Sequence, residues 1–324
     1  MHSVEAYRDH FTTYLESKSR IKEPQNLYAP IQYILGLGGK RLRPVLTLMA
    51  AEIFGADYRK ALDAALAIEI FHNFSLVHDD IMDAAPLRRG QPTVHEKWDI
   101  NTGILSGDAM LINAYQLFEN YEGKMFRDLA QLFSKTAIEV CEGQQYDVDF
   151  ESRDDVSIPE YLKMIEYKTA VLVGAALKMG GIIAGASPKD QNYIYEFGRN
   201  LGIAFQLQDD YLDAFGSMET FGKQIGGDII ENKKTYLYLK AMEKGSESQV
   251  LEMAHLYSIK PEEPGGKINT VKEIFLDSGA AEITKSAIKS YTDTAFEVLE
   301  KLRLPQEKQS ILKAFGKNLM GREV

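Results

Sequence analysis

Apolar residues recur at intervals of three and four along most of this chain, and strict alternation is scarce. This spacing is typical of amphipathic helices, because positions three and four apart share one helical face. One such face runs from Ala61 to Asp79, and another from Leu132 to Asp147. Prolines fall at expected helix starts, as in Ser157–Glu160 and Ser187–Asp190. We therefore predict an all-α fold.

The chain has 324 residues, more than an average domain needs. No shift in composition and no Gly/Ser-rich linker divides it, and no solenoid repeat runs along it. The segment from Pro261 to Gly266 is expected to be a loop. We predict one all-helical domain over residues 1–324, built as a single large helical bundle.

The composition limits the class of protein. Apolar residues make up 45% of the chain and charged residues 26%, which are values of a globular protein. The net charge of −10 argues against a general binder of nucleic acid. The single cysteine, Cys141, rules out an internal disulfide, fits a reducing compartment and is expected to be a small buried residue. No apolar run is long enough to span a membrane and no secretory signal begins the chain, so we expect a cytoplasmic protein.

Two acidic motifs of the form D-D-x-x-D stand 130 residues apart, each at the end of an apolar helical run: Asp79–Asp83 and Asp209–Asp213. On a helix the first and last Asp lie about 40° apart and one turn apart, so three carboxylates crowd one face. Such a cluster needs counter-charge. Carboxylate oxygens alone favour Mg²⁺ or Mn²⁺ over Zn²⁺, and Mg²⁺ is commonly shared with substrate phosphates. A single copy is also compatible with a solvated acidic turn, but two copies at helix ends favour a diphosphate site between two acidic walls.

Basic residues gather near turns in this acidic chain. Lys40, Arg41 and Arg43 lie in the sequence Gly38–Pro44, and Arg88 and Arg89 follow the first acidic motif. Further lysines at expected breaks are Lys168, Lys223, Lys233 and Lys234. Arg offers phosphate a bidentate fork and Lys a point charge. Any one of these lysines is compatible with an exposed surface residue, but their places beside the acidic motifs indicate anion sites.

Taken together, these motifs resemble those of the trans-isoprenyl diphosphate synthases, the polyprenyl synthetase family. The resemblance runs from about Pro30 to about Thr235. The motifs that carry it are G-G-K-R-x-R-P, D-D-x-x-D followed by R-R-G-Q-P, G-Q-x-x-D at Gly143–Asp147, Lys168-Thr169, F-Q-x-x-D-D-x-x-D at Phe205–Asp213, and the pair Gly222-Lys223 and Gly226–Asp228.

The resemblance implies an all-α fold around a deep central cavity, usually a homodimer. It implies Mg²⁺-dependent head-to-tail condensation of an allylic diphosphate with isopentenyl diphosphate, with three Mg²⁺ ions in each active site. Direct metal ligands would be Asp79, Asp83 and Asp209, supported by Asp80, Asp210 and Asp213. The allylic diphosphate would be held by Arg88, Lys168 and Lys223, and isopentenyl diphosphate by Lys40, Arg43, His72 and Arg89. Thr169 and Gln206 would line the reacting centre, and Lys233 and Asp228 would close the metal site.

The implied mechanism needs no Ser, Cys or His nucleophile, and the sequence suggests no such triad. Metal ions and cations would draw charge onto the leaving diphosphate, which weakens the allylic C–O bond. The double bond of isopentenyl diphosphate would capture the carbocation, and a proton would then be lost. Water must be excluded, because it would trap the cation as an alcohol.

The length of the product should depend on the residues that precede the first acidic motif. The candidates are Phe71, Phe74 and Ser75, since a bulky ring would stop the growing tail. A helical wheel places Ser75 nearer than Phe74 to the face of Asp79. We expect a C20 product, with C15 as the next choice. His78, beside the motif, is expected to pack against a helix rather than to bind a metal.

Three other functions are compatible with part of these features. A terpene cyclase also ionises allylic diphosphates, but it normally lacks a second full D-D-x-x-D and the G-G-K-R-x-R-P element. A catalytically silent regulatory subunit usually loses an acidic motif, whereas both are intact here. A Mg²⁺-dependent diphosphatase would need no site for isopentenyl diphosphate.

Overall fold

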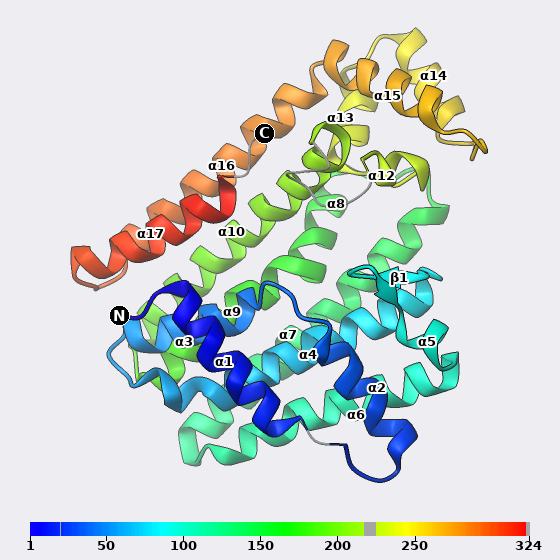
Figure 1. Cartoon of the computed structure of the whole chain (residues 1–324). Helices are drawn as coiled ribbons and strands as arrows, with labels where there is room; N and C mark the ends of the chain where they lie inside the picture. The colour runs from blue at the N-terminus through cyan, green and yellow to red at the C-terminus, as the bar shows by residue number, and fades with distance from the viewer. Residues whose placement is uncertain (20, 217–224, 322–324) are drawn as a thin grey trace. The chain divides into compact units, whose positions relative to one another are not determined.

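A computed structural model describes residues 1–19, 21–216 and 225–321 of the chain. Lys223 and its neighbour Gly222 lie outside the described residues. Within the described residues the chain is helical except for turns and one short pair of strands, which confirms the all-α prediction (Figure 1). The chain divides into two compact units. Unit 1 comprises Met1–Thr136 and Ala175–Tyr195, and unit 2 comprises Ala137–Gly174 and Glu196–Val324. The prediction that the chain forms one domain around a deep central cavity stays a prediction.

Unit 1 is built around helix α4 (Leu62–Met82). Every residue from Ala64 to Phe71 is buried, as expected of a helix surrounded by others. The α4 helix packs against α3 and α6, with α2 and α5 also in contact (Figure 1). The other helices are α1 (Val4–Lys18), α2 (Gln25–Gly36), α3 (Leu42–Ile53), α5 (Val94–Lys97) and α6 (Ile100–Gln116), with 3₁₀ turns at Tyr58–Ala61 and Leu117–Asn120.

Unit 2 is centred on helix α13 (Tyr236–Lys244), which packs against α8, α14, α15 and α16. The α16 and α17 helices run side by side (Figure 1). The helices of this unit are α8 (Ile158–Ile165), α12 (Gly227–Ile230), α14 (Glu247–Leu256), α15 (Gly265–Asp277), α16 (Ala280–Glu300) and α17 (Gln306–Met320), with a π-helical turn at Glu166–Ala170. Three long helices contribute to both units: α7 (Gly123–Ser152), α9 (Val171–Ile183) and α10 (Pro188–Phe215).

The helix starts follow the local signals in the sequence. Ser157 forms a capping box with Glu160 at the start of α8. At the start of α10, the Ser187 hydroxyl accepts a hydrogen bond from the backbone N–H of Asp190 at 3.1 Å. The loop expected to reach Gly266 ends earlier, because α15 already begins at Gly265.

Two local features differ from the sequence-based expectation. The first is a small antiparallel pair, β1 (Leu87–Arg88) and β2 (Gln91–Pro92). It forms because Arg89 and Gly90 both adopt positive φ, as a tight two-residue hairpin turn requires. The second is Cys141, which is exposed rather than buried. It lies on the outer face of α7, a position that the apolar spacing alone did not reveal.

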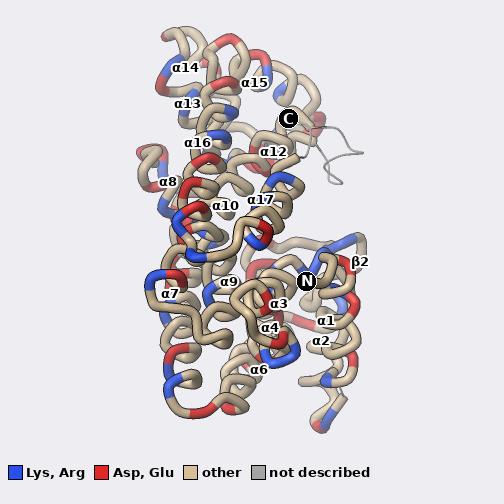
Figure 2. The backbone as a smooth tube through the Cα atoms, turned by 90° about the vertical axis from the view of Figure 1, so that its left-hand side faces the viewer, with Lys and Arg blue, Asp and Glu red and all other residues tan. Residues whose placement is uncertain are grey.

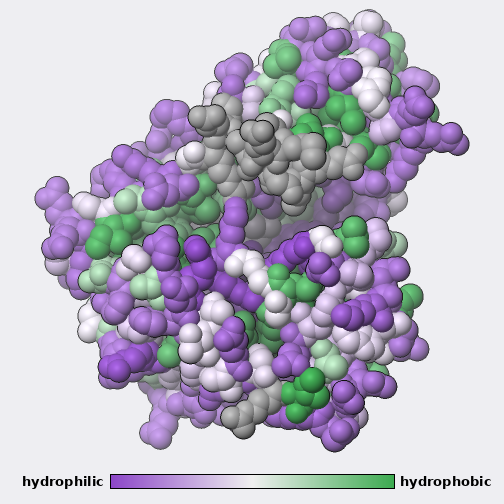
Figure 3. Space-filling model, viewed as in Figure 1, coloured by the Kyte–Doolittle hydropathy of each residue, from purple (hydrophilic) through white to green (hydrophobic). Residues whose placement is uncertain are grey.

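The charged residues are distributed along many helices. Figure 2 shows acidic and basic residues interspersed along the tube in both units. On the face drawn in Figure 3, hydrophilic residues cover most of the surface over α1 and α2, with a few hydrophobic residues between them. Among the described residues, no helix combines the length and the apolar character that crossing a bilayer requires. A cytoplasmic location stays a prediction.

Candidate functional site

The first acidic motif lies at the carboxyl end of α4, in unit 1. Asp79 is half-buried, and Asp83 is exposed at the C-cap, where its N–H donates to the carbonyl of Asp79 at 2.9 Å. Asp80 is buried, and Arg88 of the hairpin donates to both its carboxylate oxygens at 2.6–2.9 Å. Burial raises the pKa of Asp80, and the Arg88 charge opposes that rise. The middle Asp is thus engaged by a guanidinium, while the outer two lie one turn apart.

The four residues predicted to hold isopentenyl diphosphate all lie in unit 1. Burial, together with the charges of Arg43, Arg88, Arg89 and Arg41, holds the pKa of His72 well below its usual value, so that His72 is neutral. The guanidinium of Arg89 donates to the carbonyl of Gly38. Lys40 is exposed at the same turn. The structure therefore brings basic residues of the Gly38–Pro44 turn and of the hairpin together around α4.

The second acidic motif lies near the carboxyl end of α10, in unit 2. Asp209 is half-buried, whereas Asp210 and Asp213 are buried. The hydroxyl of Tyr161 and the side-chain amide of Gln206 both donate to Asp210, the latter at 3.0 Å. Burial and the charge of Asp228 raise the pKa of Asp210 well above its usual value.

Asp213 is held by the segment that carries Asp228. The backbone N–H of Asp228 donates to the Asp213 carboxylate at 2.9 Å, and the N–H of Gly226 donates to the Asp213 carbonyl at 2.6 Å. Lys233 is exposed just after α12, and its N–H donates to the carbonyl of Asp228 at 2.9 Å. Backbone N–H groups of the G-G-D motif thus donate to both the carboxylate and the carbonyl of Asp213 in the second acidic motif.

Lys168 and Thr169 lie in the π-helical turn between α8 and α9. Such turns are rare and are frequent at functional sites. The ammonium of Lys168 donates to the Asp147 carboxylate at 2.6 Å, and the hydroxyl of Thr169 donates to the side-chain oxygen of Gln206 at 3.2 Å. These contacts give the G-Q-x-x-D motif a structural role. Asp147 pairs with Lys168, and Gly143, which has no side chain, lets α7 approach the turn.

The residues expected to set chain length lie on two sides of α4. Phe74 and Phe71 are buried, with ring centroids 5.5 Å apart, and Phe74 also packs on the ring of His78 at 4.8 Å. His78 in turn faces α6, and a Cβ placed on Gly107 would overlap its Nε2 and lie 2.6 Å from its Cδ2. Ser75 is half-buried and donates to the carbonyl of His72 at 2.8 Å.

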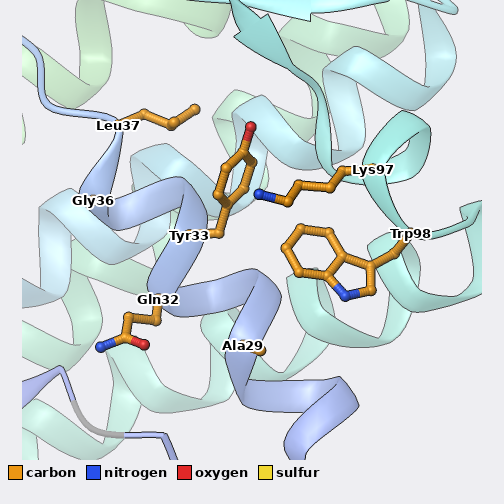
Figure 4. Close-up of a pocket in the computed structure, with 7 residues that line it drawn as sticks. All are labelled: Ala29, Gln32, Tyr33, Gly36, Leu37, Lys97 and Trp98. Carbon is orange, nitrogen blue, oxygen red and sulfur yellow. The ribbon is translucent and has the colours of Figure 1, made fainter.

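A pocket of about 420 Å³ lies elsewhere in unit 1. Figure 4 shows it between α2 and the end of α5, with the Lys97 ammonium directed at the Tyr33 ring. That ammonium lies 3.9 Å from the ring centroid, and the Tyr33 hydroxyl donates to the carbonyl of Pro92 at 2.7 Å. These contacts tether the hairpin of Arg88 to α2. None of the residues predicted to bind substrate or metal lines this pocket.

The carboxylates suit Mg²⁺ better than a metal held entirely by protein ligands. Among residues 1–19, 21–216 and 225–321, no three His, Cys, Asp or Glu side chains form a group that could hold a metal ion. Asp80 and Asp210 are engaged by Arg88 and Tyr161. Mg²⁺ commonly uses one or two carboxylates and completes its shell with water and substrate phosphate, so the donor set fits that ion.

An all-helical fold with two acidic motifs of this kind is that of the isoprenyl diphosphate synthases. The polyprenyl synthetase family model matches residues 24–275. A geranylgeranyl diphosphate synthase of Methanosarcina mazei is 39% identical over 294 residues, covering 90% of this chain and 89% of that protein. A geranylfarnesyl diphosphate synthase of Natronomonas pharaonis is 38% identical over 281 residues, covering 79% and 82%. The crystal structure of a geranylgeranyl pyrophosphate synthase matches over 100% of both chains, with 56% identity and a TM-score of 0.96.

The chain therefore belongs to the polyprenyl synthetase family. The sequence-based prediction of a trans-prenyltransferase is confirmed by these relatives. The terpene cyclase loses support for the same reason.

Proposed function

We propose that this chain condenses isopentenyl diphosphate with allylic diphosphates, in a Mg²⁺-dependent reaction, to give an all-trans C20 diphosphate. The observation that best supports the Mg²⁺ chemistry is common to both acidic motifs. In each, a partner from another segment engages the middle Asp: Arg88 for Asp80 and Tyr161 for Asp210. We assign direct ligation to Asp79, Asp83 and Asp209, supported by Asp80, Asp210 and Asp213. That both motifs act on one diphosphate, with three Mg²⁺ or Mn²⁺ ions, stays a prediction.

When bound, Mg²⁺ stabilises the charge that develops on the leaving diphosphate and so weakens the allylic C–O bond. Arg88, Lys168 and Lys223 are proposed to bind the same diphosphate through their cationic groups. Of these, Arg88 and Lys168 are already oriented by carboxylates, Asp80 and Asp147. Fixed donors of this kind stabilise developing charge without reorganising during the reaction.

The cations around α4 are proposed to bind isopentenyl diphosphate. Lys40, Arg43 and Arg89 would neutralise its diphosphate. Neutral His72 would donate one hydrogen bond to it. Thr169 and Gln206, which are hydrogen-bonded to each other, would line the reacting centre. Lys233 and Asp228 would close the metal site.

The proposed C20 product rests on Phe74 and Ser75. Small Ser75 lies one turn before Asp79, on the same side of α4, and leaves room for a tail. Phe74→Ala should lengthen the products, and Ser75→Phe should shorten them toward C15, as read by chromatography. Phe118→Ala, which opens the same aromatic cluster from the 3₁₀ turn at Leu117–Asn120 and not from α4 itself, is the control for a general packing defect. An unchanged product distribution in both α4 variants would remove these residues from the length determinant.

We also propose a homodimer that uses α6. This helix carries four large apolar residues that are at least 41% exposed: Ile100, Ile104, Leu105 and Ile112. An apolar stripe of this kind is a frequent mark of a protein interface. Light scattering on the wild type and on Leu105→Glu should show a dimer that weakens with the added charge. A monomeric wild type would refute the proposal.

Radiolabelled isopentenyl diphosphate, incubated with Mg²⁺ and a C5, C10 or C15 primer, tests the whole assignment. A C20 product is expected, and EDTA should abolish it. Asp79→Ala and Asp209→Ala should each lower turnover about a hundredfold or more, by analogy with the loss of one electrostatic stabiliser. Glu243→Ala, which changes an exposed carboxylate of α13, is the control. Turnover near the wild-type rate in either Asp variant would exclude its metal role.

A further inference from the structure

Arg41, the second basic residue of the Gly38–Pro44 turn, points into the protein. Its φ of 48° lies in the left-handed region, which residues other than glycine rarely adopt. Its side chain is buried, and the guanidinium donates to Glu69 Oε1 at 2.5 Å and to the carbonyl of Leu35. The adjacent Lys40 is exposed. Arg41 therefore ties the turn to both α2 and α4 instead of facing solvent.

Glu69, the partner of Arg41 on α4, is fixed from a second side. Asn73, one turn later, donates from its side-chain amide to Glu69 Oε1 at 3.2 Å and to the Glu69 carbonyl at 2.8 Å. Glu69 is 3% exposed and Asn73 is 0% exposed. A buried carboxylate is tolerated when it is paired and hydrogen-bonded, and these two partners give Glu69 one defined orientation.

The shape of the turn also sets the place of Arg89. The Arg89 guanidinium donates to the carbonyl of Gly38, and a Cβ on Gly39 would lie 2.9 Å from its central carbon. Burial and neighbouring cations lower the pKa of Arg89, and the Glu69 charge opposes that shift. The Glu69 charge likewise opposes the lowering of the Arg43 pKa by burial. One buried anion thus offsets the mutual repulsion of several guanidinium groups.

We propose that Glu69 is a positioning residue that keeps the Gly38–Pro44 turn in its diphosphate-binding shape through its ion pair with Arg41. The inference rests on the proposed function, in which this turn and Arg89 bind isopentenyl diphosphate. Glu69 itself touches no substrate in this scheme. Removing its charge moves the turn, and Arg43 and Arg89 then present their donors in the wrong geometry.

The test compares Glu69→Gln, Arg41→Lys and their combination with the wild type. Glu69→Gln keeps the shape of the side chain but removes its charge, and Arg41→Lys keeps the charge but removes the fork. Glu52→Gln is the matched control, because Glu52 is another hydrogen-bonded carboxylate of unit 1 that accepts from Tyr7. The measurements are KM for each substrate with the other saturating, kcat, the melting temperature, and equilibrium dialysis with radiolabelled isopentenyl diphosphate alone.

Each single variant should raise KM for isopentenyl diphosphate about tenfold, the effect of one lost charged hydrogen bond. The KM for the allylic substrate should change by less than about twofold. The double variant should raise the KM for isopentenyl diphosphate no further than either single variant, since both substitutions remove the same contact. Glu52→Gln should leave both KM values unchanged. If Glu69→Gln does not fold, Arg41→Lys decides the question.

A lower melting temperature with an unchanged KM for isopentenyl diphosphate, or an equal rise in both KM values, would overturn the role of Glu69. That result would leave the proposed function intact. If the wild type binds isopentenyl diphosphate but elongates no primer, the proposed function fails, and the dialysis results still decide the role of Glu69. A wild type that binds no isopentenyl diphosphate would refute both.

Discussion

Gly143→Ala should separate α7 from the turn that carries Lys168. A Cβ built on Gly143 would overlap the backbone nitrogen of Lys168 and would lie 2.7 Å from Lys168 Cα and from the carbonyl carbon of Tyr167. Ordinary contact begins at 3.4 Å, so the two backbones must move apart by at least about 3.4 − 2.7 = 0.7 Å. Neither backbone can rotate away as a flexible side chain would. We expect an overpacking cost of about 3 kcal/mol, offset by about 1 kcal/mol from the better helix propensity of alanine.

The net loss of about 2 kcal/mol can be measured by urea denaturation. Because the same movement displaces Lys168, kcat/KM for the allylic substrate should fall by about a hundredfold. Gly181→Ala on α9 is the matched control, since its added Cβ would meet neighbours at 3.6–3.8 Å. That variant should be as stable as the wild type or more so. Equal stability and activity for both variants would refute the reasoning from backbone contact.

Two further predictions concern buried polar groups. Tyr161→Phe removes the hydroxyl that donates to Asp210, which should cost about 1–3 kcal/mol in urea denaturation, and an unchanged midpoint would contradict this. His72 has a pKa well below its usual value of about 6.5, so the unfolded chain takes up the proton first as the pH falls. The contribution of His72 to the free energy of unfolding is therefore fully present above about pH 6.5. Below that pH it declines, by at most about 1.4 kcal/mol per pH unit. The decline in melting temperature between pH 7 and pH 5.5 should be smaller in His72→Gln, and an identical decline would refute the assignment.

The features that the sequence predicted correctly are local. Apolar spacing identified the helix that ends at the first acidic motif, and the Ser157 and Ser187 caps marked the starts of α8 and α10. Each depends on residues within a few positions of one another, so the sequence contains the whole signal. The motifs could be recognised for the same reason, because each is a short run of neighbouring residues.

The partners of the site residues were not predictable. Tyr161 lies 49 residues from Asp210, and Glu69 lies 28 residues from Arg41. Neither pair belongs to a spacing that a helix or a turn imposes. Tyr161 also occupies an ordinary buried position of α8, which resembles any other core residue in the sequence. Contacts of this kind follow from how helices pack within a unit, which a local pattern does not encode.

The two acidic motifs look equivalent in the sequence, but their middle residues have different partners. Asp80 faces Arg88, a guanidinium that is 24% exposed and is proposed to bind substrate. Asp210 faces a buried phenol and the amide of Gln206. Removing the Asp80 charge therefore leaves a cation without its partner, whereas removing the Asp210 charge relieves the burial of a carboxylate whose pKa is already raised.

The two Asp→Asn variants should consequently differ in sign. Asp80→Asn should lose about 1–3 kcal/mol, because Arg88 loses its charged acceptor. Asp210→Asn should be at least as stable as the wild type, since a rotated Gln206 amide can accept from the new amide and donate to Thr169. Urea denaturation in EDTA at pH 7 compares the variants without metal. Equal destabilisation of both would show that the difference between the partners has no energetic consequence.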